Sequence, residues 1–494
     1  MRRNAAAWRE ELGPSTLAKP EEVALVVDLD GTLSRSDTFH EAILRLGREK
    51  PLSLLRLAAA LPSGKVAAKR LVADAEIVPA EELVLNEDVT ALIEAARADG
   101  RKTILVTASD DRQAQEIARA TGLFDEAYGT GANGTDGANL SGSAKAAFLV
   151  SLFGERGFDY VGDAPVDAPV WQSARRAITV GAGAALRATA ERANSDAMHL
   201  GEPRKGGLAY LRALRPYQWS KNLLIFLPLL AAHDVSNLGI ALAAFAAFCL
   251  TASSVYVIND LLDLPADRQH PRKRNRPFAC GAVPLSHGVV MAAGLVLAAG
   301  LIGALFAPGP FILVLAAYFL ATLAYSLFLK RKLVADIMVL ACLYTLRIIA
   351  GGAATGIPLS PWMLAFSMFL FLSLAAVKRQ AELVDQVSRN VSTAPGRAYE
   401  TGDMQIIVGT ALSSAHAAVL VFALYLTSDA VTALYASAQI LWLICPILLY
   451  WLLRMVMVTS RGRMKDDPIV FASQDPISFA AVILTAVIIY SATF

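Results

Sequence analysis

The sequence of 494 residues contains only four cysteines, and their spacing fits neither a metal site nor a disulfide framework. No apolar stretch follows Met1-Arg2-Arg3-Asn4, so we expect no secretory signal peptide. The net charge is only +2, and basic residues do not alternate with aromatic ones along any stretch. The net charge argues neither for nor against nucleic acid, but without a basic aromatic stripe we expect no nucleic-acid partner.

Charged residues are scarce in the second part of the chain. From about residue 207 onward, apolar stretches long enough to cross a bilayer follow one another, whereas the earlier residues have ordinary charge density. We expect an N-terminal α/β domain and a C-terminal all-α membrane domain. The expected boundaries are a tail at 1–21, the α/β domain at 22–185, a linker at 186–206 and the membrane domain at 207–494. The first half of the stretch 182–207 is equally well explained as a final helix of the α/β domain.

The first apolar run, residues 23–27, has the composition of a buried parallel strand and ends in Asp28-Leu29-Asp30. Two carboxylates at a strand end suit phosphoryl transfer, because one can attack phosphorus while the other exchanges a proton. A metal ion must then offset the charge between carboxylate and phosphate.

Three later positions can complete such a site. A strand at 103–106 ends near Thr107, a glycine-rich stretch precedes Lys145, and a strand at 158–161 ends before Asp163 and Asp167. In an α/β sheet these side chains meet at the carboxyl edge of the strands. Each element alone is weak, since a single lysine such as Lys145 is more often a solvated surface residue.

Together and in this order, these motifs resemble the haloacid-dehalogenase (HAD) superfamily over about residues 22–185. The resemblance implies a Rossmann-like phosphatase with a helical cap at about 38–98, here expected as helices at 38–46, 52–61, 64–73 and 80–98. It implies Asp28 as the nucleophile and Asp30 as the general acid and base. Thr107 and Lys145 would bind phosphate, and the Mg²⁺ site would comprise Asp28, Asp30, Asp163 and Asp167.

Residues 259–277 place aspartates directly before a cluster of arginines and lysines, at the end of a long apolar segment. Asn259, Asp263 and Asp267 are spaced i, i+4, i+8, which puts them on one helical face, although Pro265 should end or bend the helix near Leu264. We expect Asp267 in the loop that follows. Carboxylates that bind Mg²⁺ beside cations that bind phosphate suit a polyphosphate substrate. A basic loop that only sets topology would not explain the aspartates.

We count about nine apolar segments of spanning length, the first of which, near Leu227, is short and interrupted by Pro228. Positive charge gathers in the connections at 268–276, 330–332, 378–397 and 461–465. The positive-inside rule then places the α/β domain and these connections in the cytoplasm, and an odd number of spans places Phe494 on the far side. We expect a multi-pass protein of the cytoplasmic membrane.

Polar residues at or within the spans are further candidates. Lys221 and Asn222 precede the first span, Lys330 and Asp336 flank the connection after the fourth, and Arg347 lies inside the fifth. An intramembrane arginine is a functional candidate whose partner is a bound phosphate or an aspartate, with a structural ion pair as the alternative.

The C-terminal part, about 207–494, resembles the UbiA superfamily of membrane prenyl-lipid transferases, whose N-D-x-x-D-x-x-x-D signature falls on 259–267. The narrower pattern is that of the decaprenyl-phosphate phosphoribosyltransferases, at residues 215–222, 267–277, 325–336, 347–360 and 378–383. The resemblance implies Mg²⁺ at both sites, with Asp263 and Asp267 in the catalytic centre. It implies substrate contacts from Lys221, Asn222, Lys273, Arg274, Arg276, Tyr325, Lys330, Asp336, Arg347 and Lys378.

That resemblance implies transfer of 5-phosphoribose from phosphoribosyl diphosphate to a polyprenyl phosphate in the bilayer, after which the HAD domain removes the 5-phosphate. The main alternative is an aromatic prenyltransferase that uses a prenyl diphosphate, with an independent phosphatase. A membrane part that only anchors the phosphatase is a third possibility. A transporter is disfavoured because the charges gather on one face. Oligomeric state, including a homo-oligomer, stays open.

Overall fold

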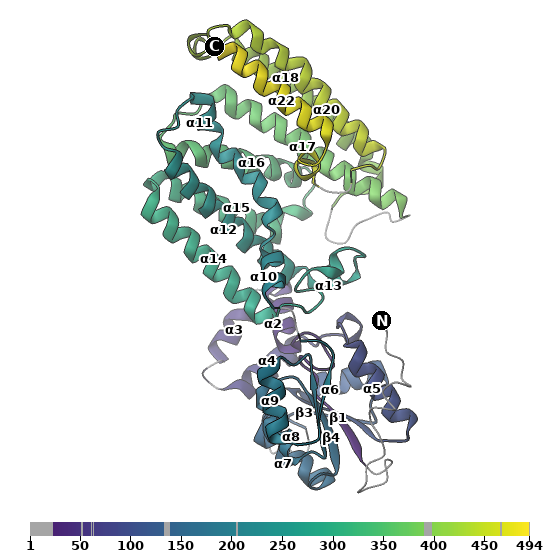
Figure 1. The fold of residues 1–494 in the computed structure, drawn as a ribbon. Helices are drawn as coiled ribbons and strands as arrows, with labels where there is room; N and C mark the ends of the chain where they lie inside the picture. The colour runs from purple at the N-terminus through teal and green to yellow at the C-terminus, as the bar shows by residue number, and fades with distance from the viewer. Residues whose placement is uncertain are drawn as a thin grey trace. The chain divides into compact units, whose positions relative to one another are not determined.

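A computed structural model describes residues 23–494 apart from 51–52, 61, 63, 133–138, 204–205, 390–397, 465–466 and 494 (Figure 1). The expected tail at 1–21, parts of the charged connections at 378–397 and 461–465, and Phe494 lie outside these residues. By their contacts the described residues form two compact units. One combines the chain up to Ala213 with Ile258–Val290, and the other combines Leu214–Val257 with Met291–Phe494.

The first unit is built on a parallel sheet with the strand order β3-β2-β1-β4-β5-β6. Its central strand pairs on both sides, with Val26 opposite Ile104 and Tyr160. The strands are β1 (Ala24–Val27), β2 (Thr103–Asp110), β3 (Glu126–Thr130), β4 (Phe158–Gly162), β5 (Arg176–Val180) and β6 (Ala197–Leu200). The α/β expectation is confirmed.

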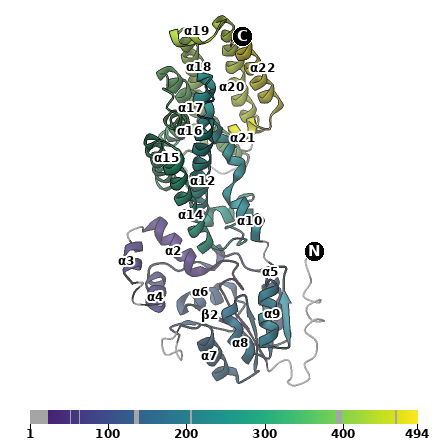
Figure 2. The ribbon, with the colours of Figure 1, turned by 60° about the vertical axis from the view of Figure 1, so that its left-hand side comes forward.

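Both faces of the sheet are covered, which explains why β1 is apolar throughout. Leu25 and Val27 face one core, and Ala24 and Val26 face the other. The helices that follow the strands are α5 (Glu87–Ala98), α6 (Asp111–Thr121), α7 (Ser143–Phe153), α8 (Ala168–Ser173) and α9 (Ala184–Ala193). Side chains of α5 and α6 belong to the first core, and those of α7, α8 and α9 to the second. Figure 2 shows these helices packed around the sheet.

The expected helical cap is present between β1 and β2. It consists of α2 (Thr38–Glu49), α3 (Ser53–Ala60), α4 (Lys65–Ala75) and the short 3₁₀ helix η3 (Ala80–Glu82). The helix expected at 80–98 is divided, because the Asn86 side chain accepts a hydrogen bond from the Asp88 amide and caps a new helix there.

Three strands were not predicted, namely β3, β5 and β6. Up to Leu200, the stretch expected as a linker at 186–206 belongs to the α/β fold. Its first half holds most of α9, the final helix that was the alternative there, and β6 follows and pairs with β5, with Ala197 opposite Ala177. These strands have four or five residues, and each contains at least one polar or charged residue, so no continuous apolar run marks them. Lys145, which follows the glycine-rich stretch, lies in the first turn of α7 and not at the end of a strand.

The aspartate-rich segment follows α12 (Leu238–Leu262), which ends one residue before Asp263. Asp263 is the N-cap of α13 (Leu264–Gln269), where Pro265 occupies the first turn and so costs no helical hydrogen bond. Asp267 therefore lies in a short helix and not in a loop, which corrects the prediction. Backbone bonds continue through the bend, from the Asp263 amide to the Asn259 carbonyl at 2.9 Å and from the Asp267 amide to Asp263 at 2.9 Å.

Helices dominate the second unit. They include the 3₁₀ helix η5 (Pro216–Phe226), α11 (Leu227–Ala232), α15 (Gly309–Leu327), α16 (Ala335–Thr355), α17 (Pro361–Ser388), α18 (Met404–Leu426), α20 (Ile444–Ser460), α21 (Pro468–Ala472) and α22 (Pro476–Thr493). Small connecting 3₁₀ helices are η6 (Lys273–Asn275), in the first unit, and η7 (Leu329–Arg331). Long α14 (Leu285–Phe306) begins in the first unit and continues into the second.

Within the described part of the chain, eight helices are long and apolar enough to cross a membrane. They are Leu238–Leu262, Leu285–Phe306, Gly309–Leu327, Ala335–Thr355, Pro361–Ser388, Thr401–Leu426, Ala438–Ser460 and Pro476–Thr493. The ninth expected segment, around Leu227, is divided into η5 and α11, and a proline opens each helix. Neither helix alone reaches spanning length.

One buried ion pair offers a test of how the sheet is stabilised. Asp159 on β4 is fully buried and accepts hydrogen bonds from Arg101, at 2.5 Å, and from Arg175, at 2.6 and 2.8 Å. We expect Asp159→Ala to lower the free energy of unfolding by about 3–5 kcal/mol, because it leaves buried guanidinium groups without their counter-ion. Amide hydrogen exchange of β4 in the full-length protein measures this change.

The exposed pair Lys102–Glu126, at 2.6 Å, is the control. Glu126→Ala should cost no more than about 1 kcal/mol, since surface pairs are screened by solvent. An equal loss of unfolding free energy in the two variants would contradict the stabilising role of the buried Asp159 ion pairs.

Candidate active sites

Three carboxylates meet at the carboxyl edge of the sheet in the first unit. Asp28 follows β1, Asp163 follows β4, and Asp167 ends a 3₁₀ turn four residues later. Oxygen atoms from the three side chains lie within 4.8 Å of one another. So many like charges at this separation repel unless a cation joins them, so the donor set fits a hard divalent ion.

A buried lysine borders these carboxylates. The Lys145 ammonium donates to the Asp28 carboxylate at 2.8 Å and to the Tyr160 hydroxyl at 2.9 Å. That hydroxyl in turn donates to Asp167 at 3.0 Å. Lys145 is only 2% exposed, so the alternative of a solvated surface lysine is wrong. Burial, together with the charge of Asp28, raises the pKa of Asp167 to about 6.

Asp30 lies outside this group of three and is held by hydroxyl groups. Its carboxylate accepts hydrogen bonds from the Thr38 amide at 2.7 Å, the Thr38 hydroxyl at 2.8 Å and the Ser109 hydroxyl at 2.7 Å. Burial and the nearby charge of Asp37 raise its pKa to about 7. A carboxyl that titrates near neutral pH suits proton transfer better than metal binding. Its role as a metal ligand stays a prediction.

Thr107 is fully buried in β2, and its hydroxyl accepts a hydrogen bond from the Ser109 amide at 3.0 Å. Its phosphate-binding role also stays a prediction. Gly31 follows the aspartates with φ +80°, and an added Cβ there would lie 2.7 Å from the carboxyl carbon of Asp163. The turn thus needs glycine both for its backbone angle and for the space beside Asp163.

In the aspartate-rich segment of the same unit, an arginine lies between carboxylates. Arg276 donates to Asp267 at 2.5 Å and to Asp260 at 3.1 Å, and both carboxylates are almost completely buried. Asp260 was not among the predicted site residues, although it belongs to the N-D-x-x-D-x-x-x-D signature. The amide oxygen of Asn259 is buried without a hydrogen-bond partner among the described residues.

Two basic candidates of this segment are not part of the Arg276 network. Lys273 and Arg274 are exposed in η6. Among the described residues of this segment, no three carboxylates lie as close together as those of the HAD site. The orphan oxygen of Asn259 beside acidic residues fits a metal ligand, and the metal role of Asn259, Asp263 and Asp267 stays a prediction.

In the second unit, Asp336 at the start of α16 is fully buried and paired with Arg379 of α17. Tyr325 donates to Asp336 at 2.8 Å, and Arg379 donates to the Tyr325 oxygen at 2.8 Å and to Glu382 at 2.5 Å. Lys330 is half-buried in η7. Arg379, which was not predicted, is therefore the centre of this network.

Asp467, also not predicted, joins two of the candidate lysines. Its carboxylate lies 2.7 Å from the Lys221 ammonium and 3.1 Å from that of Lys378. Burial lowers the pKa of Lys221 to about 8, against the opposing effect of Asp467. Although burial opposes it, the two lysines hold the pKa of Asp467 well below its usual range.

Arg347, expected to pair with a phosphate or an aspartate, is buried among neutral groups. It donates to the Asn222 side chain at 2.9 Å, the Tyr318 hydroxyl at 2.8 Å and the Leu343 carbonyl at 2.5 Å. Its guanidinium lies 5.2 Å from the centre of the Tyr344 ring, and the Lys221 ammonium lies 5.8 Å from the same ring. Lys221, Asn222 and Arg347 thus come together as neighbours.

Both parts of the chain match known protein families. A model of the UbiA prenyltransferase family matches residues 223–489, and one of haloacid dehalogenase-like hydrolases matches residues 25–172. The chain belongs to the UbiA prenyltransferase family. It carries a HAD domain at its N-terminus, so both expected resemblances are confirmed, and its apolar helices make this UbiA protein a multi-pass membrane protein.

Among its relatives, the uncharacterized protein y4nM of Sinorhizobium fredii is 37% identical over 465 residues, which cover 93% of this chain and 89% of that protein. The nodulation protein NoeC of Azorhizobium caulinodans is 35% identical over 56% of this chain and 90% of its own length. The decaprenyl-phosphate phosphoribosyltransferase of Mycolicibacterium smegmatis is 40% identical over 37% of this chain and 59% of that enzyme.

A solved UbiA homolog from Archaeoglobus fulgidus, bound to DMAPP and Mg²⁺, is also similar to this UbiA-family chain. The similarity covers 57% of this chain and 99% of that chain, with 16% sequence identity and a TM-score of 0.44.

The Gly31 turn provides a test of the HAD site. We expect Gly31→Ala to lower Mg²⁺-dependent hydrolysis of p-nitrophenyl phosphate about 100-fold, because the added Cβ displaces the expected metal ligand Asp163, and a misplacement of about 1 Å at an active site has an effect of this size. Gly183→Ala is the control, since nothing lies within 4 Å of an added Cβ there. Wild-type turnover in the Gly31 variant would show that Asp163 is not needed where the structure places it.

Proposed function

We propose that this UbiA-family chain transfers 5-phosphoribose from phosphoribosyl diphosphate to a polyprenyl phosphate, and that its HAD domain then removes the 5-phosphate. The observation that carries the proposal is the charge around Tyr344. Lys221, Lys378 and Arg347 gather there with Asp467 as the carboxylate partner of the two lysines. Among the described residues, these three cations share one carboxylate, with Lys221 and Arg347 buried and Lys378 partly exposed. A polyanionic substrate would balance the two remaining positive charges.

The relatives support the same substrates. The aligned enzymes from Mycolicibacterium smegmatis and Mycobacterium tuberculosis are named decaprenyl-phosphate phosphoribosyltransferases, at 40% and 41% identity. A phosphoribosyl donor and a lipid phosphate acceptor bring more phosphate groups than a prenyl diphosphate and an aromatic acid. The loop at 268–276 adds less to this argument than its sequence suggests, because Arg276 is already bound to Asp260 and Asp267.

In this proposal the aspartate-rich segment would hold Mg²⁺ through Asn259, Asp263 and Asp267. The ion would neutralise the diphosphate and make it a better leaving group. Binding there requires Arg276 to move away from Asp267 or to share it with the ion. An acceptor phosphate oxygen forms the new bond to C1 of ribose, while the bond from C1 to the diphosphate oxygen breaks and that oxygen keeps the electron pair.

The HAD residues fit the second step. Asp28 would attack the 5-phosphorus and form an aspartyl phosphate, while Asp30 donates a proton to the departing ribose oxygen. Asp30 would then take a proton from the water that releases inorganic phosphate. Lys145 and Thr107 would bind the phosphate oxygens, and Mg²⁺ at Asp28, Asp163 and Asp167 would offset the approach of like charges.

The proposed donor also indicates on which side of the membrane the reaction takes place. Phosphoribosyl diphosphate is a soluble anion, so we propose that the HAD domain and the charged connections face the cytoplasm, as the distribution of Lys and Arg favours. Fusion of the two activities in one chain would raise the effective concentration of the lipid product at the phosphatase.

Product analysis tests the donor directly. Purified protein in lipid vesicles with polyprenyl phosphate, Mg²⁺ and ribose-labelled phosphoribosyl diphosphate should transfer label into the lipid phase. Asp263→Ala should reduce this transfer at least about 100-fold, as expected for loss of a metal ligand at the reacting group. Alkylation of an aromatic acid by a prenyl diphosphate, with phosphoribosyl diphosphate left intact, would replace this function with aromatic prenyl transfer.

The order of the two steps has its own test. Asp28→Asn keeps the size of the side chain but removes the attacking charge, so no aspartyl phosphate forms. The labelled lipid should then keep its 5-phosphate, which mass spectrometry detects as one additional phosphate per molecule. Appearance of the dephosphorylated lipid at the wild-type rate would separate the HAD domain from this pathway.

A further inference from the structure

Arg268 of the aspartate-rich segment is bonded to the phosphatase cap, within the first unit. Its guanidinium forms a two-pronged ion pair with Glu41 of α2, at 2.7 and 2.9 Å. It also donates to the Glu82 carbonyl at 2.7 Å and to the Ser36 hydroxyl at 3.1 Å, and its Nε donates to the Ala279 carbonyl at 3.2 Å. With both side chains at least 92% buried, Arg268 has no donor left for a substrate phosphate.

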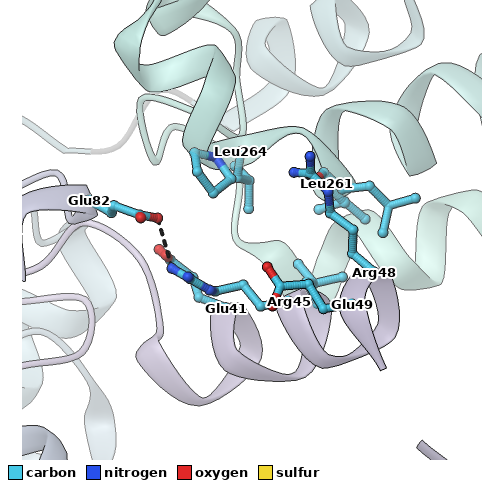
Figure 3. A pocket seen from close by; sticks show the side chains of 10 residues that line it. Glu41, Arg45, Arg48, Glu49, Glu82, Leu261 and Leu264 are labelled. Carbon is cyan, nitrogen blue, oxygen red and sulfur yellow. Dashed lines mark hydrogen bonds and ion pairs between the residues drawn. The ribbon is translucent and has the colours of Figure 1, made fainter. Parts of the chain in front are cut away.

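Further contacts join the same two segments. Arg48, in the last turn of α2, donates to the Leu262 carbonyl at 3.1 Å. Glu41 and Arg48 are seven residues apart and so lie on one face of the helix. Figure 3 shows this face of α2 beside Leu261 and Leu264, around a cavity of about 180 Å³.

The backbones of the two segments also approach each other closely at Gly281 and Arg35. An added Cβ at Gly281 would lie 2.6 Å from the Cβ of Arg35 and 2.8 Å from its carbonyl oxygen. The chain that leads into α2 therefore packs tightly on the chain that follows the aspartates.

The N-terminal end of α2 contacts the proposed acid/base residue of the phosphatase. Thr38 is the first residue of α2, and its amide and hydroxyl both hold the Asp30 carboxylate. Glu41, which binds Arg268, lies less than one helical turn further along. A displacement of α2 therefore moves the hydrogen-bond donors of Asp30.

We propose that Arg268 is a positioning residue of the phosphatase: an arginine from the transferase sequence fixes cap helix α2 and, through Thr38, orients Asp30. This inference rests on the phosphatase part of the proposed function. Because Arg268 directly follows Asp267, the segment that would bind the transferase metal also completes the cap of the second enzyme.

The test is hydrolysis of p-nitrophenyl phosphate with Mg²⁺ by the full-length protein, a reaction that needs no transferase substrate. We expect Arg268→Gln to lower kcat at least about tenfold with KM nearly unchanged, because the proton donor is misplaced while phosphate binding remains. Arg268→Lys, which keeps the charge but not the fork, should lie in between. Arg56→Gln, at an exposed arginine of the cap, should match the wild type.

A double-mutant cycle separates positioning from general destabilisation. Glu41→Gln combined with Arg268→Gln should lower kcat no further than either change alone, since both remove the same contact. Amide exchange of the first turn of α2 should rise in all three variants, and this readout needs no catalysis. Wild-type kcat and exchange in Arg268→Gln, additive losses in the cycle, or an equal loss in Arg56→Gln would overturn the proposal. A chain that hydrolyses the ester but ignores phosphoribosyl diphosphate would refute only the proposed donor.

Discussion

A charge removed from water needs hydrogen-bond partners, and most of the buried charges described above also have a counter-ion. This constraint organises both units of the protein. Breaking a buried pair costs several kcal/mol because it leaves one charge without compensation. Arg276 therefore accompanies Asp260 and Asp267, and Arg379 accompanies Asp336. Within each unit, candidate site residues are therefore held in place by ion pairs with other buried side chains.

Local motifs identified most of the candidate site residues. They did not predict which of these residues form ion pairs with one another or with other side chains. Asp28 and Asp163 were predicted because each directly follows an apolar strand, and neighbouring parallel strands bring their ends together. Arg379 binds a residue 43 positions away, and Lys221 binds Asp467 across 246 positions. One sequence without relatives contains no signal for such contacts.

The same limit explains the errors in the fold. β6 and the helix around Asp267 depend on partners distant in sequence or on a cap, and short elements have too little periodicity to be predicted alone. The cations of the 268–276 loop were counted together as phosphate ligands from composition. In the structure these cations have different partners. Arg268 forms an ion pair with Glu41 of α2, and Arg276 forms an ion pair with Asp267.

Asp467 gives the second unit an internal counter-ion. Any anion that reaches Lys221 and Lys378 must displace this carboxylate, so its net binding energy is the difference between two ionic interactions. Small anions such as chloride or inorganic phosphate gain little by this exchange. In the proposed function, a ligand with several phosphate groups that also engages Arg347 would gain more, and Asp467 would then act as a filter against the common ions of the cell.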